Sequence, residues 1–152
     1  MITEFLPKNE FMLECLRLAH LALEQGEVPV GAIVELDGKI IGFGHNQTEK
    51  LQDPTAHAEV LAIKMACKNL GNWRLCGANL YVSMEPCVMC TGTIINSRIK
   101  RVIFGAHDRI GGALGSAVDL TKMNKSKKIL IYRGFMEAEC ASLLRGFFKN
   151  LR

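Results

Sequence analysis

Two short stretches, His57-Ala58-Glu59 and Pro86-Cys87-Val88-Met89-Cys90, decide how this 152-residue sequence is interpreted. They supply one histidine and two cysteines with the spacing of metal ligands, and a carboxylate two residues after the histidine. A structural zinc site normally closes with four protein ligands, whereas a catalytic site leaves one position open for water. The local count stops at three, and no other histidine or cysteine of the sequence has the local spacing of a fourth ligand. We therefore expect a metal site that activates water.

Both ligand groups are predicted to lie at the start of a helix. Cys87 and Cys90 are three residues apart in the first turn of a helix predicted over 87–97, so their side chains share a face. Free backbone N–H groups and the positive end of the helix dipole stabilise thiolates there. His57 opens a helix predicted over 56–70. Because helix N-termini gather at the carboxyl edge of a sheet in open α/β folds, we expect these sequence-distant ligands to meet.

Charge counting favours zinc with a separate base. Two thiolates neutralise Zn²⁺ and leave a neutral histidine and one open position. Thiolates donate more charge than neutral ligands, so we expect the bound water to be acidified less than at an all-histidine site. A base is then useful, and Glu59 is the candidate. We expect His57, Cys87 and Cys90 to hold one Zn²⁺ per subunit. Pro-Cys-x-x-Cys alone would equally fit a redox pair or half of a zinc ribbon.

The remaining sequence predicts an α/β fold. Asp37-Gly38 is a hairpin turn signal, residues 46–54 are predicted to be loop, and Thr55 is the expected N-cap of the second helix. Strands separated by helices indicate a three-layer αβα sandwich, with a five-stranded mixed sheet and helices on both faces. We expect one domain over 1–152. Helices are predicted over 8–25, 56–70, 87–97 and 136–151, and strands over 31–36, 39–44, 80–82, 101–106 and 129–132.

Composition sets the broad class. A chain that is 49% apolar and 22% charged is typical of a soluble globular protein. No apolar run reaches the length of a membrane helix, and residues 1–7 carry no secretory signal, so we expect a cytoplasmic protein without a membrane partner. The net charge of +4 permits a polyanionic partner. Four further cysteines lie among apolar neighbours and are expected to be structural: Cys15, Cys67, Cys76 and Cys140.

The longer motifs resemble the bacterial tRNA-specific adenosine deaminases, which have the cytidine deaminase-like fold. The stretches that carry this resemblance are 27–32, 53–59, 85–90, 104–106, 115–116 and 139–144. The resemblance extends from about residue 10 to 150. It implies hydrolytic deamination of adenosine to inosine at the wobble position of a tRNA anticodon stem-loop, chiefly of an arginine tRNA, by a homodimer.

The same resemblance implies a role for individual residues. Glu59 would take a proton from the attacking water and deliver protons to the base and to the leaving amine. The Ala58 N–H and the Asn46 side chain would bind the flipped nucleoside. Without the resemblance, Asn46 would be interpreted as a turn residue. The other residues expected to bind substrate are Val30 and Pro86, as walls of the base pocket, and His107 and Asp108, as RNA contacts.

The segment after the fourth predicted strand departs from the family pattern. Family members commonly carry lysine two residues after the aspartate, whereas here Arg109 follows Asp108 directly. His107 and Asp108 could also be a solvated pair at a strand end. Seven basic residues nearer the C-terminus could contact phosphates or form solvated faces: Lys122, Lys125, Lys127, Lys128, Arg145, Lys149 and Arg152.

Two alternative functions stay open at this point. A deaminase of a free nucleobase or nucleoside, of the guanine or cytosine type, would use the same metal core. A non-catalytic, zinc-folded RNA-binding module would have no use for an unligated carboxylate, so Glu59 argues against it.

Overall fold

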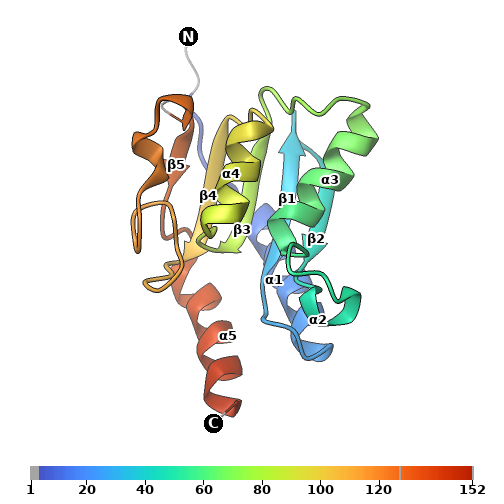
Figure 1. Cartoon of the computed structure of the whole chain (residues 1–152), viewed down its shortest axis with the longest axis vertical. Helices are drawn as coiled ribbons and strands as arrows, with labels where there is room; N and C mark the ends of the chain where they lie inside the picture. The colour runs from blue at the N-terminus through green and yellow to red at the C-terminus, as the bar shows by residue number, and fades with distance from the viewer. Residues whose placement is uncertain (1–3, 127, 152) are drawn as a thin grey trace.

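A five-stranded sheet lies between two layers of helices in the computed structural model, which describes residues 4–126 and 128–151 (Figure 1). The strands are β1 (Gly31–Leu36), β2 (Lys39–His45), β3 (Asn79–Met84), β4 (Arg101–Ala106) and β5 (Leu130–Tyr132). The helices are α1 (Asn9–Glu24), α2 (Thr48–Leu51), α3 (Ala58–Leu70), α4 (Val88–Asn96) and α5 (Glu137–Asn150), with 3₁₀ turns at Leu120–Lys122 and Asn124–Ser126. The predicted three-layer fold is confirmed.

Side-chain alternation along the strands builds two separate apolar cores. In β1, Ala32 and Val34 pack with α3, whereas Ile33 between them packs with α1 on the opposite face. The same alternation continues in β3, β4 and the helices that cover them. Consequently α3 and α4 cover one face of the sheet, and α1 and α5 cover the other (Figure 1). The strands are therefore buried on both sides, as their nearly continuous apolar sequences require.

Strand direction determines which loops meet. The sheet order is β2-β1-β3-β4-β5, with β1 antiparallel to both neighbours and β4 and β5 parallel to β3. The chain therefore leaves β2, β3 and β4 at the same edge of the sheet, where it also enters β1. At the opposite edge, Asp37 and Gly38 have φ of 52° and 84° and form the predicted β1–β2 hairpin turn.

The second long helix begins later than predicted. It starts at Ala58, two residues after the predicted start, and His57 is the N-cap. The Thr55 hydroxyl and N–H both donate to the Asp53 carboxylate, at 2.7 and 2.8 Å. This local turn uses the hydroxyl that was expected to cap the helix, so the prediction for Thr55 is wrong.

The loop predicted over 46–54 contains the short helix α2. Its N–H groups at Glu49 and Lys50 donate to the buried carboxylate of Glu27, at 3.0 and 2.8 Å. A partner 22 residues earlier in the chain therefore stabilises a turn that its own polar sequence does not predict. The 3₁₀ turns in the polar segment 121–128 were likewise not predicted, and Lys127 and Arg152 lie outside the described residues.

No helix in the described part of the chain is both long and apolar enough to cross a membrane.

Close contact between α3 and β2 depends on Gly42. A Cβ atom built at Gly42 would lie 2.2 Å from the Ala62 carbonyl oxygen and 2.7 Å from the Ala66 backbone nitrogen. Since both atoms belong to the helix backbone, neither can rotate away. The helix α3, which has His57 as its N-cap, is therefore held directly against the sheet.

Replacing Gly42 with alanine should lower the free energy of unfolding by about 2 kcal/mol, because α3 must shift away from β2. Gly146→Ala is the matched control: a Cβ there meets nothing within 4 Å, and alanine favours the helix. Denaturant unfolding of the two variants measures both effects. Equal stability of the two variants would contradict the close packing of α3 on β2.

Candidate metal centre and substrate pocket

Most of the residues that the sequence predicts for the site lie at one edge of the sheet. Asn46 follows β2, Glu85 follows β3, and His107 and Asp108 follow β4. Val30 lies at the same edge because β1 runs in the opposite direction. The N-termini of α3 and α4 also point to this edge, which agrees with the expectation that both ligand stretches open helices.

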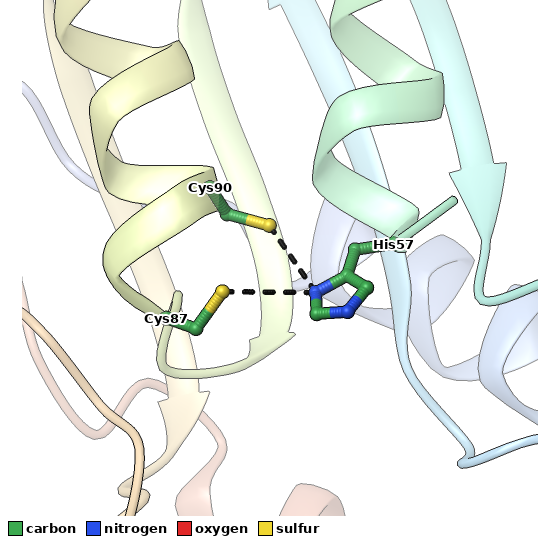
Figure 2. A group of neighbouring side chains, drawn as sticks. All are labelled: His57, Cys87 and Cys90. Carbon is green, nitrogen blue, oxygen red and sulfur yellow. Dashed lines mark hydrogen bonds between the residues drawn. The ribbon is translucent and has the colours of Figure 1, made fainter. Parts of the chain in front are cut away.

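His57, Cys87 and Cys90 come together between the N-termini of α3 and α4 (Figure 2). The His57 Nδ1 atom lies 3.7 Å from the Cys87 Sγ atom and 3.4 Å from the Cys90 Sγ atom. All three ligand atoms lie within 4.8 Å of one another. Figure 2 shows both thiols directed from α4 towards the imidazole.

These distances fit a tetrahedral zinc ion. Zinc binds cysteine sulfur at about 2.3 Å and histidine nitrogen at about 2.0 Å, so the two atoms lie about 3.5 Å apart at a tetrahedral angle. The two measured nitrogen–sulfur distances lie on either side of that value. The three residues could therefore hold one Zn²⁺, with their histidine–cysteine–cysteine donor set leaving a fourth position to water.

The pKa values of the two cysteine thiols are shifted in opposite directions. The pKa of Cys87 is lowered to about 4, mainly because the Cys90 thiol donates a hydrogen bond to the Cys87 sulfur; a further hydrogen bond with His57 acts in the same direction. The same hydrogen bond, together with burial, raises the pKa of Cys90. The pKa of His57 is raised by its hydrogen bond to Cys87. Metal binding would require the sulfur of Cys90, as well as that of Cys87, to be deprotonated.

Glu59 is a buried carboxylate beside these ligands. Its side chain is 4% exposed, and burial raises the pKa of Glu59 to about 6. No lysine or arginine lies within ion-pair distance of it in the described residues, 4–126 and 128–151. A buried acid with a pKa near neutrality can both accept and return a proton, which is the property of a general acid–base group.

A pocket of about 210 Å³ opens beside this group. It is smaller than the 300–1,000 Å³ typical of ligand sites. Of the residues predicted to form the site, seven line the pocket: Val30, Asn46, His57, Ala58, Glu59, Cys87 and Asp108. Ala58 is the first residue of α3, where a backbone N–H has no acceptor within the helix.

Asn46 has an unused hydrogen-bond acceptor. Its side chain is 7% exposed, and the Oδ1 atom is buried without a hydrogen-bond partner in the described part of the chain. Its backbone N–H donates to the Val30 carbonyl at 3.1 Å, which fixes the residue against the pocket wall. An unpaired buried acceptor costs free energy unless a ligand or water satisfies it. The geometry therefore favours ligand binding over the turn role.

Pro86 does not line the pocket, and His107, which was expected to contact RNA, lines an adjoining groove instead. The His107 Nδ1 atom lies 2.8 Å from the Glu137 carboxylate at the start of α5, and its ring packs edge-on against Phe104. Pro86 is buried between two lining residues, and its carbonyl accepts a hydrogen bond from the Ala113 N–H at 2.9 Å.

An open groove adjoins the pocket. It has a volume of about 580 Å³, and Met84 and Asp108 line both spaces. The groove combines exposed apolar side chains, such as Ile110 at 96% exposure, with basic ones. Its basic residues are Arg109, Arg145 and Lys149. Of the seven basic residues considered above, five lie in the described part of the chain, and two of these, Arg145 and Lys149, lie beside the pocket together with Arg109.

Three pocket residues were not predicted: Val28, Met84 and Glu85. Val28 and Glu85 belong to the quoted motifs but were given no role. The signal for Glu85 was its position, an acid between an apolar strand and the first cysteine ligand. The sequence around Met84 indicates only the end of a buried strand, and the sheet geometry alone places it at the pocket.

Comparison with known proteins agrees with this site. The model of the MafB19-like deaminase family matches residues 7–152. The tRNA-specific adenosine deaminase of Bacillus subtilis (strain 168) is 44% identical over 143 residues, covering 93% of this chain and 89% of that protein. The corresponding enzyme of Aquifex aeolicus (strain VF5) is 44% identical over 95% of this chain and 96% of that protein.

Similar solved structures include two kinds of deaminase. A structure from a study of A-to-I editing by tRNA:A34 deaminases at the wobble position of transfer RNA superposes with a TM-score of 0.87, at 43% identity, over 90% of this chain and 100% of that chain. A guanine deaminase from Bacillus subtilis has a TM-score of 0.63 at 41% identity, over 67% of this chain and 66% of that chain.

Sequence and fold therefore agree over nearly the whole chain, and the protein belongs to the MafB19-like deaminases, in the family of the tRNA-specific adenosine deaminases.

Proposed function

We propose that the protein is a zinc-dependent deaminase that converts adenosine to inosine at the wobble position of a tRNA anticodon loop. The observation that carries this proposal is the convergence of His57, Cys87 and Cys90 with the buried carboxylate of Glu59 at one small pocket. A site that served only to hold the fold together would need neither the carboxylate nor the pocket.

His57, Cys87 and Cys90 would hold one Zn²⁺ per subunit. When bound, the metal lowers the pKa of water and so supplies a nucleophile near neutral pH. Glu59 would accept one proton of the attacking water and deliver it to the ring nitrogen of adenine. It would then accept the second proton from the attacking oxygen and deliver it to the amine, which leaves as ammonia. Because Glu59 is 4% exposed, bulk water does not compete for these protons.

The pocket walls would bind and orient one base. The unpaired Oδ1 atom of Asn46 accepts a hydrogen bond from the substrate, and the N–H of Ala58 donates one. Val30 and Met84 supply apolar surface for the flat base. The volume of about 210 Å³ suits a single base extruded from its strand rather than a larger ligand.

The adjoining groove favours RNA over a free base. A base in an unpaired loop costs little to extrude, and the flanking nucleotides must then lie beside the pocket. The groove there offers three basic side chains and exposed apolar groups, which suit phosphates and bases respectively. Asp108 lines both the pocket and the groove, in keeping with the proposed RNA contact.

Further proposals rest on the resemblance and on the composition. We propose an arginine tRNA as the main substrate, a homodimer as the active form, and a cytoplasmic location. We also propose that residues 1–152 act as one deaminase domain, which the single sheet with a helix layer on each face supports.

Deamination of a free guanine is a second candidate, because a guanine deaminase shares this fold at 41% identity. We expect the zinc-loaded protein to form inosine in an anticodon stem-loop with a wobble adenosine, and to leave free adenosine, cytidine and guanine unchanged. Chromatography of digested RNA and of the free compounds measures both. Conversion of guanine without conversion of the stem-loop would overturn the proposed substrate.

Replacing Glu59 with alanine should lower kcat on the stem-loop by about a hundredfold or more, because no other group is placed to move the proton. Binding of the stem-loop and the zinc content should persist. The matched control is Glu24→Ala, since Glu24 is an exposed acid at the end of α1. Undiminished inosine formation by the Glu59 variant would rule out the assigned role.

Salt dependence tests the groove. In the inactive Glu59→Ala background, the double change Arg145→Gln/Lys149→Gln should weaken stem-loop binding. The slope of log Kd against log salt should fall by about 0.7 for each phosphate that the protein no longer neutralises. Lys39→Gln/Lys68→Gln removes the same charge at the opposite edge of the sheet and should leave the slope unchanged. Identical slopes for both double variants would exclude the groove as the RNA path.

A further inference from the structure

Glu85 links the end of β3, the strand that precedes the cysteine ligands, to the end of the neighbouring strand β4. It lies between the last residue of β3 and Pro86, and its side chain is 3% exposed. Its backbone N–H donates to the carbonyl of Ala106, the last residue of β4, at 2.8 Å. The backbone of Glu85 is therefore fixed by the ends of both strands, independently of its side-chain contacts.

The carboxylate of Glu85 binds a single loop. The Oε2 atom accepts from the N–H groups of Leu114 and Ser116, at 3.0 and 3.1 Å. The Oε1 atom accepts from the N–H of Asp108 at 3.2 Å and from the Ser116 hydroxyl. All four donors lie between residues 108 and 116, which we call the Glu85-bound loop.

This loop contains none of the helices or strands of the fold. Besides Glu85, it is held by the bridges Cys87–Gly112 and Leu114–Asp119 and by the Ala113 N–H, which donates to the Pro86 carbonyl at 2.9 Å. The Arg133 side chain donates to the Leu114 carbonyl at 3.1 Å, and the Leu114 side chain packs in the core with α3 and α4. The loop also closes tightly around the carboxylate: a Cβ atom built at Gly112 would lie 2.4 Å from the Glu85 Cδ atom. Glu85 is thus the centre about which the loop folds.

Backbone dipoles, not a cation, compensate the charge of Glu85. Within residues 4–126 and 128–151, no lysine, arginine or histidine nitrogen lies within 4.0 Å of it. Burial of a carboxylate is costly unless hydrogen-bond donors satisfy it, and here each oxygen accepts two. With its acceptor sites occupied, Glu85 is not placed to take a proton from substrate, although it lines the same pocket as Glu59.

The loop that Glu85 holds lies on the path from the pocket to the groove. Asp108 lines both spaces, and Arg109 and Ile110 continue along the groove. The Asp108 carboxylate accepts from the N–H groups of Ile110 and Gly111, both at 3.1 Å, so the start of the loop forms a hydrogen-bonded turn. Release of the Glu85 carboxylate would displace the groove wall while leaving His57, Cys90 and Glu59 in place.

We propose that Glu85 is a positioning residue for the RNA strand: its carboxylate fixes the Glu85-bound loop, and so sets the affinity for RNA without taking part in proton transfer. This inference rests on the proposed function, because it assigns the groove to the substrate strand. It gives the two buried acids of one pocket different roles: Glu59 transfers protons, and Glu85 fixes the shape of the pocket entrance.

The test replaces Glu85 with glutamine, which keeps the shape but turns an N–H₂ group towards backbone N–H donors. Amide hydrogen exchange should accelerate by about tenfold or more at Leu114 and Ser116, since these amides lose a charged acceptor. The KM for the stem-loop should rise about tenfold, whereas kcat should stay within about threefold and the zinc content should not change.

Glu27→Gln is the matched control for the exchange measurement. Glu27 is also a buried acid, 1% exposed, that accepts N–H groups of a pocket-side segment, those of Glu49 and Lys50. The Glu27→Gln variant should speed hydrogen exchange at those two amides and leave exchange in the Glu85-bound loop unchanged. Ser116→Ala is the milder second variant, because it removes one of the four donors; it should raise KM two- to threefold, and it decides the matter if the glutamine variant does not fold.

Three outcomes would overturn the proposal. Unchanged exchange and unchanged KM would show that Glu85 does not hold the loop. A fall in kcat at constant KM would assign Glu85 to the chemistry. Faster exchange throughout the sheet, or loss of zinc, would give it a general structural role. If the unaltered protein forms no inosine in RNA, the proposed function fails, whereas the exchange result still decides whether Glu85 anchors the loop.

Discussion

The common direction of β2, β3 and β4 is the constraint on which the site depends. Because β1 runs antiparallel between β2 and β3, the chain leaves all three strands at one edge of the sheet. Each exit contributes a different part: Asn46 after β2, Glu85 with the cysteines after β3, and Asp108 after β4. The close approach of α3 to β2 at Gly42 then brings His57 to the same edge.

Free backbone N–H groups at this edge stabilise the negative groups that the site needs. Cys87 is the N-cap of α4, where a thiolate is favoured. Glu85 and Glu27 are buried without a cation among the described residues and are satisfied mainly by N–H groups of the two irregular segments beside the pocket. The loops of the site are thus held by carboxylates from the sheet edge, not by packing alone, since loops of this kind bury little apolar surface.

Sequence patterns predicted most of the fold, and they failed where a side-chain carboxylate, nearby or distant in the sequence, decided the local structure. The ranges 31–36 and 101–106 match β1 and β4 residue for residue, because each strand is a nearly continuous buried run. The predicted start of α3 was wrong because the Thr55 hydroxyl donates its hydrogen bond to the Asp53 carboxylate. The helix α2 was missed because its partner, Glu27, lies more than 20 residues away in the sequence.

By itself, the sequence determined which donors the site offers: the spacing of His57, Glu59, Cys87 and Cys90 specifies the chemical types of the proposed ligands and of the proposed proton carrier, since these depend only on residue identity. Only the tertiary structure decided which residues surround that set. It left the Asn46 oxygen unpaired at the pocket, paired His107 with Glu137, and made Glu85 the centre of a loop. These outcomes depend on strand order and direction, which bring together groups that no local pattern relates.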